Sequence, residues 1–239
     1  GIPSMKAMLE ALIAAPSVSS VSPAWDQGNE RVVELLEHWT GALGFDTRVL
    51  DIPGHPNKTN LIAAAGSGPE GLVLAGHTDT VPYDPERWSF DPLRLTESAG
   101  RLYGLGTSDM KSFFAVVLEA VRDLDPGRLK RPLVILGTAD EESTMCGAQR
   151  LVDLQMRLGR HAVIGEPTGL RPVRMHKGIA MEAIRVEGRS GHSSDPSLGL
   201  NALEGMHRVI GEVLAWRSEL QRRFRNEAFR VPVPTLNLG

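Results

Sequence analysis

The sequence predicts an α/β domain with a mixed, largely parallel sheet flanked by helices, followed by part of a second domain of α+β type. Up to residue 166, apolar runs typical of strands alternate with amphipathic segments typical of helices. That alternation indicates parallel strands joined by crossover helices. After Lys177 the pattern changes to one strand, one long helix and one extended segment. We therefore expect a first domain over residues 5–177 and a partial second domain over residues 178–239.

The first domain is expected to contain four helices and seven strands. Apolar residues at helical spacing mark the helices, and Gly44 is a natural stop for the second of them. Short apolar runs mark the strands, and Ala99-Gly100 is the expected turn of a hairpin. The expected helices are residues 5–14, 29–43, 110–124 and 147–158. The expected strands are residues 45–50, 60–65, 72–77, 94–96, 101–103, 132–138 and 162–165.

The second domain is expected to contain a strand over residues 179–186, a Gly- and Ser-rich loop over residues 188–194 and a long helix over residues 198–225. An extended segment follows from residue 231 to residue 238. We interpret this order as a strand–helix–strand fragment of an α+β domain.

Composition narrows the classes of partner. The formal net charge is -3 and no basic stripe runs along the chain, which disfavours nucleic-acid binding. No apolar run reaches the roughly 18 residues that a membrane-spanning helix needs. Cys146 is the only cysteine, so no intrachain disulfide can form, and we expect a cytoplasmic protein. Nucleic acid and membrane are therefore not expected partners.

The strand over residues 72–77 ends in the candidate site. His77 and Asp79 lie two residues apart, so their side chains lean to the same side of an extended chain. Neutral imidazole is the commonest metal ligand in proteins, and a neighbouring carboxylate can fix its tautomer. A polar turn at a strand end is the alternative interpretation, because the His-x-Asp pattern is short.

Further carboxylates occupy equivalent positions in the chain. Glu141, Glu142 and Glu166 each follow a predicted strand, and Asp109 lies in a Gly-rich turn before a helix. Sites in open α/β sheets form beyond the carboxyl ends of the strands. Histidine with several carboxylates suits zinc, cobalt or manganese, and Asp109 could bridge two ions through its two oxygens. The sequence therefore predicts a metal site at this edge of the sheet.

Two adjacent carboxylates, Glu141 and Glu142, can divide the chemistry between them. Neighbouring side chains point in different directions, so one can bind a metal ion while the other reaches a water molecule as general base. A solvated loop is the alternative for a Glu pair, but the position directly after the strand over residues 132–138 favours function.

Other chemistries find less support. The Gly104-Leu105-Gly106 turn lacks the third glycine of a dinucleotide fingerprint and the lysine of a P-loop, so phosphate binding is discounted. No Gly-x-Ser-x-Gly elbow is present. Cys146 is interpreted as a small buried thiol, and His55 lies in a loop with no assigned role.

Four segments taken together resemble the M20 family of zinc aminoacylases and deacetylases. They are His-Thr-Asp at residues 77–79, Gly-Leu-Gly-Thr-Ser-Asp-Met-Lys at residues 104–111, Asp-Glu-Glu at residues 140–142 and Gly-Glu-Pro-Thr at residues 165–168. Residues 175–178, 191–196 and 231–239 support the same resemblance. It implies a zinc-peptidase-like catalytic domain and part of a lid domain through which family members form homodimers.

The resemblance also implies which residues bind metal. His77 and Glu166 would bind the first zinc ion, Glu142 would bind the second, and Asp109 would bridge them. One or two zinc ions are expected, with cobalt as a possible substitute. The family has a further histidine ligand in a C-terminal segment that this chain does not contain, which would leave only Asp109 and Glu142 on the second ion.

The implied catalytic residues are Asp79, Glu141 and His192. Asp79 would orient His77, and Glu141 would be the general base. His192, in the lid domain, would hold the substrate carbonyl as it becomes an oxyanion, where charge stabilisation contributes most.

The implied reaction is hydrolysis of a small N-acylated amino acid by a metal-activated water. N-acetylornithine, a precursor in arginine biosynthesis, is the expected substrate. N-acetylcitrulline, N-succinyl-diaminopimelate and dipeptides are the alternative substrates within the family. A non-catalytic fragment that binds or dimerises is the alternative from another class of protein.

Overall fold

The computed structural model describes residues 1–239, which divide into two compact units, Gly1–Leu170 and Arg171–Gly239. The first unit contains every paired strand and the helices α1 to α4, and the second contains the long helix α5. The division of the chain into a catalytic domain over residues 5–177 and a lid domain over residues 178–239 stays a prediction.

The first unit is built on a five-stranded sheet with the order β1-β2-β6-β3-β7. The strands are β1 (Asp46–Asp51), β2 (Thr59–Ala65), β3 (Leu72–His77), β6 (Leu133–Thr138) and β7 (His161–Ile164). β3 runs parallel to β6 and to β7, whereas β2 runs antiparallel to β1 and to β6. The sheet is mixed, as predicted.

Only half of these four pairings are parallel, so parallel pairings are not the majority that the sequence predicts. The reason is the short connection between β1 and β2. A connection of that length makes antiparallel neighbours, because a parallel pair needs a crossover of a dozen or more residues. The predicted hairpin is confirmed as β4 (Thr96–Ser98) and β5 (Arg101–Tyr103). Ala99 and Gly100 both have positive φ in its turn, as two-residue hairpin loops require.

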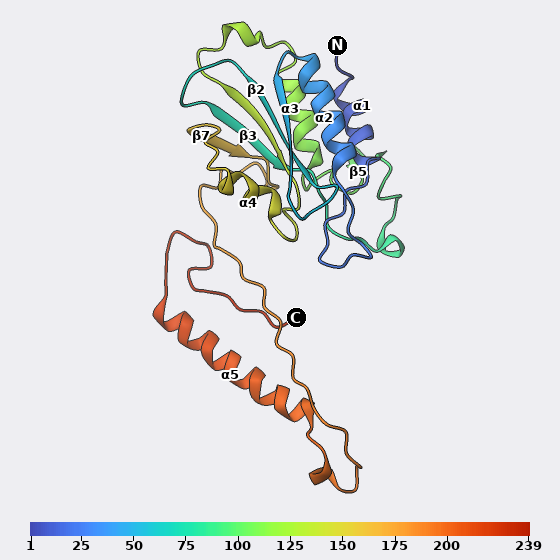
Figure 1. The fold of residues 1–239 in the computed structure, drawn as a ribbon, viewed down its shortest axis with the longest axis vertical. Helices are drawn as coiled ribbons and strands as arrows, with labels where there is room; N and C mark the ends of the chain where they lie inside the picture. The colour runs from blue at the N-terminus through green and yellow to red at the C-terminus, as the bar shows by residue number, and fades with distance from the viewer. The chain divides into compact units, whose positions relative to one another are not determined.

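Helices cover both faces of the sheet. α1 (Met5–Ile13), α2 (Glu30–Ala42) and α3 (Lys111–Ala120) pack together on one face (Figure 1). Their apolar stripes and the sheet form the larger core, and α4 (Cys146–Asp153) packs Leu151 on a smaller cluster at the other face. Fully burying a side chain of this kind stabilises the fold by about 1.5–3 kcal/mol. The larger core therefore fixes the edge of the sheet at which β3 and β6 end.

Local contacts set the ends of these helices. The Ser4 hydroxyl accepts a hydrogen bond from the Ala7 amide at the start of α1, and Gly44 ends α2 with a φ of +81°. The buried Lys111 ammonium donates to the carbonyls of Leu12, in the last turn of α1, and of Ala15, just after the helix. Burial lowers the pKa of Lys111 to about 8. The start of α3, and with it the Gly-rich turn, is thereby tied to α1.

The second unit is dominated by α5 (Ala202–Arg223). The helix begins at Asn201, whose side chain accepts hydrogen bonds from the amides of Leu203 and Glu204. The prediction of a strand over residues 179–186 was wrong. No neighbouring strand is there to pair with its backbone, and Ile179 and Met181 are 86% and 75% exposed. An extended segment without such a partner does not form a stable strand.

The extended segment over residues 231–238 is likewise unpaired, so the predicted strand–helix–strand fold of the second unit is not found. The long helix is confirmed, although it begins at residue 202 and not at residue 198. No helix of the chain combines the length and the hydropathy that crossing a bilayer requires.

Candidate metal centre

The ends of three parallel strands bring the candidate residues together. His77 is the last residue of β3 and lies in register with Thr138 at the end of β6. β7 runs on the other side of β3, with Ile164 in register with Ala75. The segments that follow β6 and β7 carry Glu141, Glu142 and Glu166. Parallel strands therefore deliver these side chains to one edge of the sheet, as the sequence predicts.

A first group of possible metal ligands contains His77, Asp109 and Glu166. His77 Nε2 lies 2.9 Å from Asp109 Oδ1 and 3.8 Å from Glu166 Oε1. The three ligand atoms all lie within 4.8 Å of one another. The turn before α3 and the segment after β7 thus meet at a single imidazole nitrogen.

A second group contains His77, Glu141 and Glu142, whose ligand atoms also lie within 4.8 Å of one another. The three carboxylates expected to bind metal, and the expected general base Glu141, are therefore all neighbours of His77. The imidazole is buried, whereas the Asp109 and Glu166 side chains are 48% and 40% exposed. The carboxylates accordingly line the open side of the group, from which an ion or a small molecule can approach.

Asp79 holds both His77 and the loop after β6 that carries Glu141 and Glu142, which we call the glutamate loop. Its backbone carbonyl lies 3.0 Å from His77 Nδ1, which assigns a proton to Nδ1. Nε2, which faces Asp109, is therefore the nitrogen that can bind a metal ion. Its carboxylate oxygens accept hydrogen bonds from the amides of Glu141 and Glu142 at 3.2 and 3.0 Å. The carboxylate itself is 3.6 Å from His77 Nδ1. Asp79 therefore orients the imidazole through its main chain and the loop through its side chain.

Negative charge is in excess around His77. Burial, reinforced by the nearby charge of Asp109, raises the pKa of Glu142 to about 7 and also raises the pKa of Glu166. Burial disfavours the charged imidazole, but the carboxylates of Asp79, Asp109 and Glu166 raise the pKa of His77 above its ordinary value. Carboxylates that repel one another in this way are stabilised by a divalent cation. The donor set of one imidazole and several carboxylate oxygens fits zinc or cobalt.

A pocket of about 310 Å³ opens beside the acidic group. Asp109 and Glu142 lie in its wall, together with the Gly-rich turn and apolar side chains that include Trp88 and Leu102. Gly106 in this turn has a φ of +91°, and a Cβ there would lie 3.1 Å from the Lys111 side chain. Glycine is therefore required where the turn passes Lys111. The volume is at the lower end of the range for small-molecule sites.

Sequence reasoning missed the residues that anchor Asp140, directly before the two glutamates. Lys58 Nζ lies 2.5 Å from Asp140 Oδ1 and 2.7 Å from Asp26 Oδ1. Thr144 donates to the other oxygen of Asp140 at 2.7 Å. Asp140 has a φ of +59°, an uncommon conformation that these contacts hold in place. The sequence offers no signal for this ion pair, because Lys58 and Asp140 are 82 residues apart.

His192 lies in the second unit, Arg171–Gly239. Its Nδ1 accepts a hydrogen bond from the Ser194 amide at 3.2 Å and lies 2.7 Å from the Ser194 hydroxyl. An acceptor role for Nδ1 assigns the proton of the neutral ring to Nε2. The exposed imidazole therefore presents an N–H donor to its surroundings, and its place in a catalytic site stays a prediction.

Comparison with known proteins gives the family. Residues 73–232, more than half of the chain, match Peptidase family M20/M25/M40. The chain belongs to this family. The matched segment contains every residue of the acidic group around His77.

Curated relatives within the M20 family are similar along the whole chain. Acetylornithine deacetylases of Pasteurella multocida (strain Pm70) and of Pectobacterium carotovorum subsp. carotovorum (strain PC1) are each 52% identical over 238 residues, which is 100% of this chain. The chain spans 62% of the length of each of these relatives.

Among solved structures, an M20 family metallo-carboxypeptidase from Sulfolobus solfataricus has a TM-score of 0.55 at 20% identity, over 69% of this chain and 37% of that one. Human carnosine dipeptidase 1 has a TM-score of 0.54 at 22% identity, over 67% of this chain and 38% of that one. At such identities the likeness supports the fold, which is an α/β fold of the M20 type with a mixed sheet flanked by helices.

Proposed function

We propose that this M20 protein is a zinc-dependent amidohydrolase that converts N-acetyl-L-ornithine to L-ornithine and acetate. The observation that carries the proposal is the 52% identity to acetylornithine deacetylases along the whole chain. The acidic group around His77 supports the same reaction class, since metal-assisted hydrolysis needs such a donor set beside a small-molecule pocket.

The proposed metal ligands are His77, Asp109, Glu142 and Glu166, which would hold one or two zinc ions. When bound, zinc supplies positive charge that polarises the scissile carbonyl and lowers the pKa of a nearby water molecule. Cobalt accepts the same ligands and serves as a spectroscopic substitute. The excess of carboxylates around a single imidazole supports this assignment.

Glu141 is the proposed general base. Its side chain lies with those of His77 and Glu142, and its amide is fixed by the Asp79 carboxylate. The Glu141 carboxylate would accept a proton from the attacking water and deliver it to the leaving amine, so that the amide bond breaks to acetate and free amine. Asp79 would maintain the positions of His77 and the glutamate loop throughout this step.

His192 is proposed to donate its Nε2–H to the carbonyl oxygen as negative charge develops on it. The free Nε2–H that follows from the Ser194 contact supports this role.

We further propose a cytoplasmic homodimer that associates through residues 178–239. Sedimentation of the purified protein tests the association, and a monomer at every concentration would contradict it.

The experiment that tests the function measures acetate release from N-acetylornithine by the metal-stripped protein, before and after zinc or cobalt is restored. We expect turnover only with metal. Glu141→Gln should lower kcat by about 10²–10⁴-fold while metal binding persists, because general-base catalysis contributes an effect of that size. Glu34→Gln, an exposed position on α2, is the matched control.

Three outcomes would contradict parts of the proposal. Preference for N-acetylcitrulline, N-succinyl-diaminopimelate or a dipeptide in a substrate panel would replace the proposed specificity but keep the reaction class. Full activity of Glu141→Gln would remove the general-base assignment. No hydrolysis of any of these substrates in the presence of metal would favour a binding or dimerising protein.

A further inference from the structure

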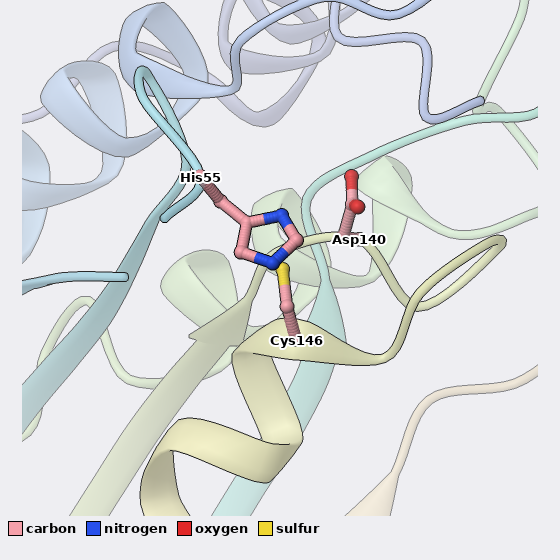
Figure 2. A group of neighbouring side chains, drawn as sticks. All are labelled: His55, Asp140 and Cys146. Carbon is pink, nitrogen blue, oxygen red and sulfur yellow. The ribbon is translucent and has the colours of Figure 1, made fainter. Parts of the chain in front are cut away.

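A second cluster of side chains that could bind a metal ion includes the residue directly before Glu141. It consists of His55 from the connection between β1 and β2, Asp140 after β6, and Cys146 at the start of α4. Figure 2 shows the imidazole beside the thiol sulfur, with the Asp140 side chain across from them. The three ligand atoms lie within 4.8 Å of one another. The cluster shares no residue with the group around His77.

The imidazole of His55 is free to serve as a ligand. The backbone of His55 is fixed, since its N–H donates to Ile52 and its C=O accepts from Lys58. Its side chain is half-buried and turned toward Cys146. A half-buried imidazole at the end of a short loop can adjust its position at little cost, and neutral imidazole is a good ligand for zinc.

Asp140 can bind an ion in exchange for one of its present donors. Lys58, Thr144 and Ser143 all donate to its oxygens. Ser19 and the Cys146 thiol also lie within reach of this carboxylate. Since a carboxylate offers about four lone-pair sites, a metal ion must take the place of one of these donors, as it does when it displaces the thiol proton. The Cys146 thiol is buried, and burial raises its pKa. A metal ion that binds there must displace the thiol proton, as it does at any cysteine ligand.

The spacing suits a tetrahedral ion after a small adjustment. Zinc lies about 2.0–2.3 Å from nitrogen, oxygen and sulfur ligands, which places the ligand atoms about 3.5 Å apart. The three ligand atoms lie within 4.8 Å of one another, so no pair has to move closer by much more than 1 Å. Rotation of the His55 side chain can supply a movement of this size, and a water molecule can complete the coordination.

We propose that His55, Asp140 and Cys146 form a second metal site, selective for divalent ions with affinity for sulfur, that controls the glutamate loop. Asp140 directly precedes Glu141 and Glu142, and its contacts with Lys58 and Thr144 hold the turn at that point. A metal ion that draws the carboxylate toward Cys146 alters those contacts. Zinc in excess of the catalytic requirement therefore inhibits the enzyme through this site, a consequence that rests on the proposed function.

Titration of the metal-stripped protein with cobalt tests binding without any assay of activity. The expected ligands around His77 include no sulfur, and Cys146 is the only cysteine. A thiolate-to-cobalt charge-transfer band in the near ultraviolet therefore reports this site alone. We expect the band to level off at the intensity of one thiolate–cobalt bond per chain, after cobalt has also filled the group around His77, and to be absent in Cys146→Ser. In His55→Gln we expect at least a tenfold weaker cobalt affinity, whereas His38→Gln, an exposed histidine on α2, is unchanged.

Absence of the band at saturating cobalt would overturn the proposal, as would a band of unchanged affinity in His55→Gln, which would indicate a lone thiol. Because Glu142→Gln weakens only the first site, the band must persist in that variant. The inhibitory role is tested separately in active enzyme. Excess zinc should slow the wild type at least tenfold and His55→Gln much less, and equal inhibition of the two would overturn the regulatory role even if cobalt binds.

Discussion

Two charged clusters meet at residues 140–142, and they differ in how their charges are balanced. On one side, the Lys58 ammonium lies between Asp26 and Asp140, and the Lys58 and Asp140 side chains are only 4% and 3% exposed. On the other side, a single imidazole faces Asp109, Glu142 and Glu166, none of them paired with a lysine or arginine. The first cluster is compensated by its own residues, and the second is not.

The difference separates a structural role from a functional one. Burial of a charge is tolerated when a partner and hydrogen bonds compensate it, and the Lys58 cluster meets both conditions. Carboxylates gathered without a cation raise one another's pKa values, and such perturbation is typical of functional sites. Residues 140–142 thus connect the buried Lys58–Asp140 ion pair, which anchors the loop, to the proposed cation site around His77. Each of the following changes tests one of these two clusters.

The largest expected effect is on stability. Lys58→Met leaves Asp140 buried without its cation, so the free energy of unfolding should fall by about 3–5 kcal/mol. Urea unfolding followed by circular dichroism measures the change. Lys6→Met is the matched control, because the Lys6–Glu97 pair is equally short but exposed on both sides, and its loss should leave stability unchanged.

A second variant separates charge from packing at the same position. Lys58→Met combined with Asp140→Asn removes both charges and keeps a side chain that tolerates the positive φ at this position. It should recover much of the lost stability, because no unpaired charge is left buried. Equal effects of Lys58→Met and Lys6→Met would show that the buried cluster is not an anchor.

A smaller effect is expected on metal affinity. Asp79→Asn keeps the shape of the side chain but directs an NH₂ group at one of the two loop amides, which now has no acceptor. Zinc affinity should fall by about 10–100-fold, the usual cost of losing a residue that orients metal ligands. Competition with a chelator measures it, and Asp51→Asn, exposed at the end of β1, serves as control. Unchanged affinity would mean that Asp79 does not position the ligands.

The smallest expected effect is the pH dependence of the metal-free protein. Glu142 has a pKa of about 7 in the folded chain against an ordinary value of 4.5. The folded state therefore binds more protons between these values, and the free energy of unfolding falls as pH rises from 4.5 through about 7. Because the side chain is partly exposed, the loss is about 1 kcal/mol. Glu142→Gln should flatten this slope, and zinc should reverse it; a slope that survives Glu142→Gln would assign the effect elsewhere.

Much of the first unit could be predicted from local sequence. The apolar run that ends at His77 marks a buried strand, and carboxylates placed directly after such strands predict a shared edge. The antiparallel pairing of β2 with β6 could not be predicted, because it depends on which distant strand lies beside β2 in space. The strand over residues 179–186 failed for the same reason, since an apolar pattern cannot reveal whether a partner is present.

The anchoring residues were beyond sequence reasoning for a different reason. Lys58 reads as a surface residue in a polar loop, and only the fold reveals that it is buried against Asp140. The same holds for His55 and Cys146, which are 91 residues apart in the chain and meet only because β1, β6 and α4 converge. Three of the four ligands proposed around His77 stand at or just after strand ends and could be predicted from local sequence. The residues that hold the glutamate loop in place come together only in the folded chain, so the sequence alone could not reveal them.

The hydrogen bonds from the Glu141 and Glu142 amides to Asp79 have an evolutionary consequence. The loop is held by its main chain, so the identities of the side chains at these two positions do not determine its path. A single substitution there can exchange a metal ligand or a proton acceptor while the backbone keeps its place. New metal preferences or new leaving groups are therefore accessible by one mutation at a time, without an unstable intermediate sequence.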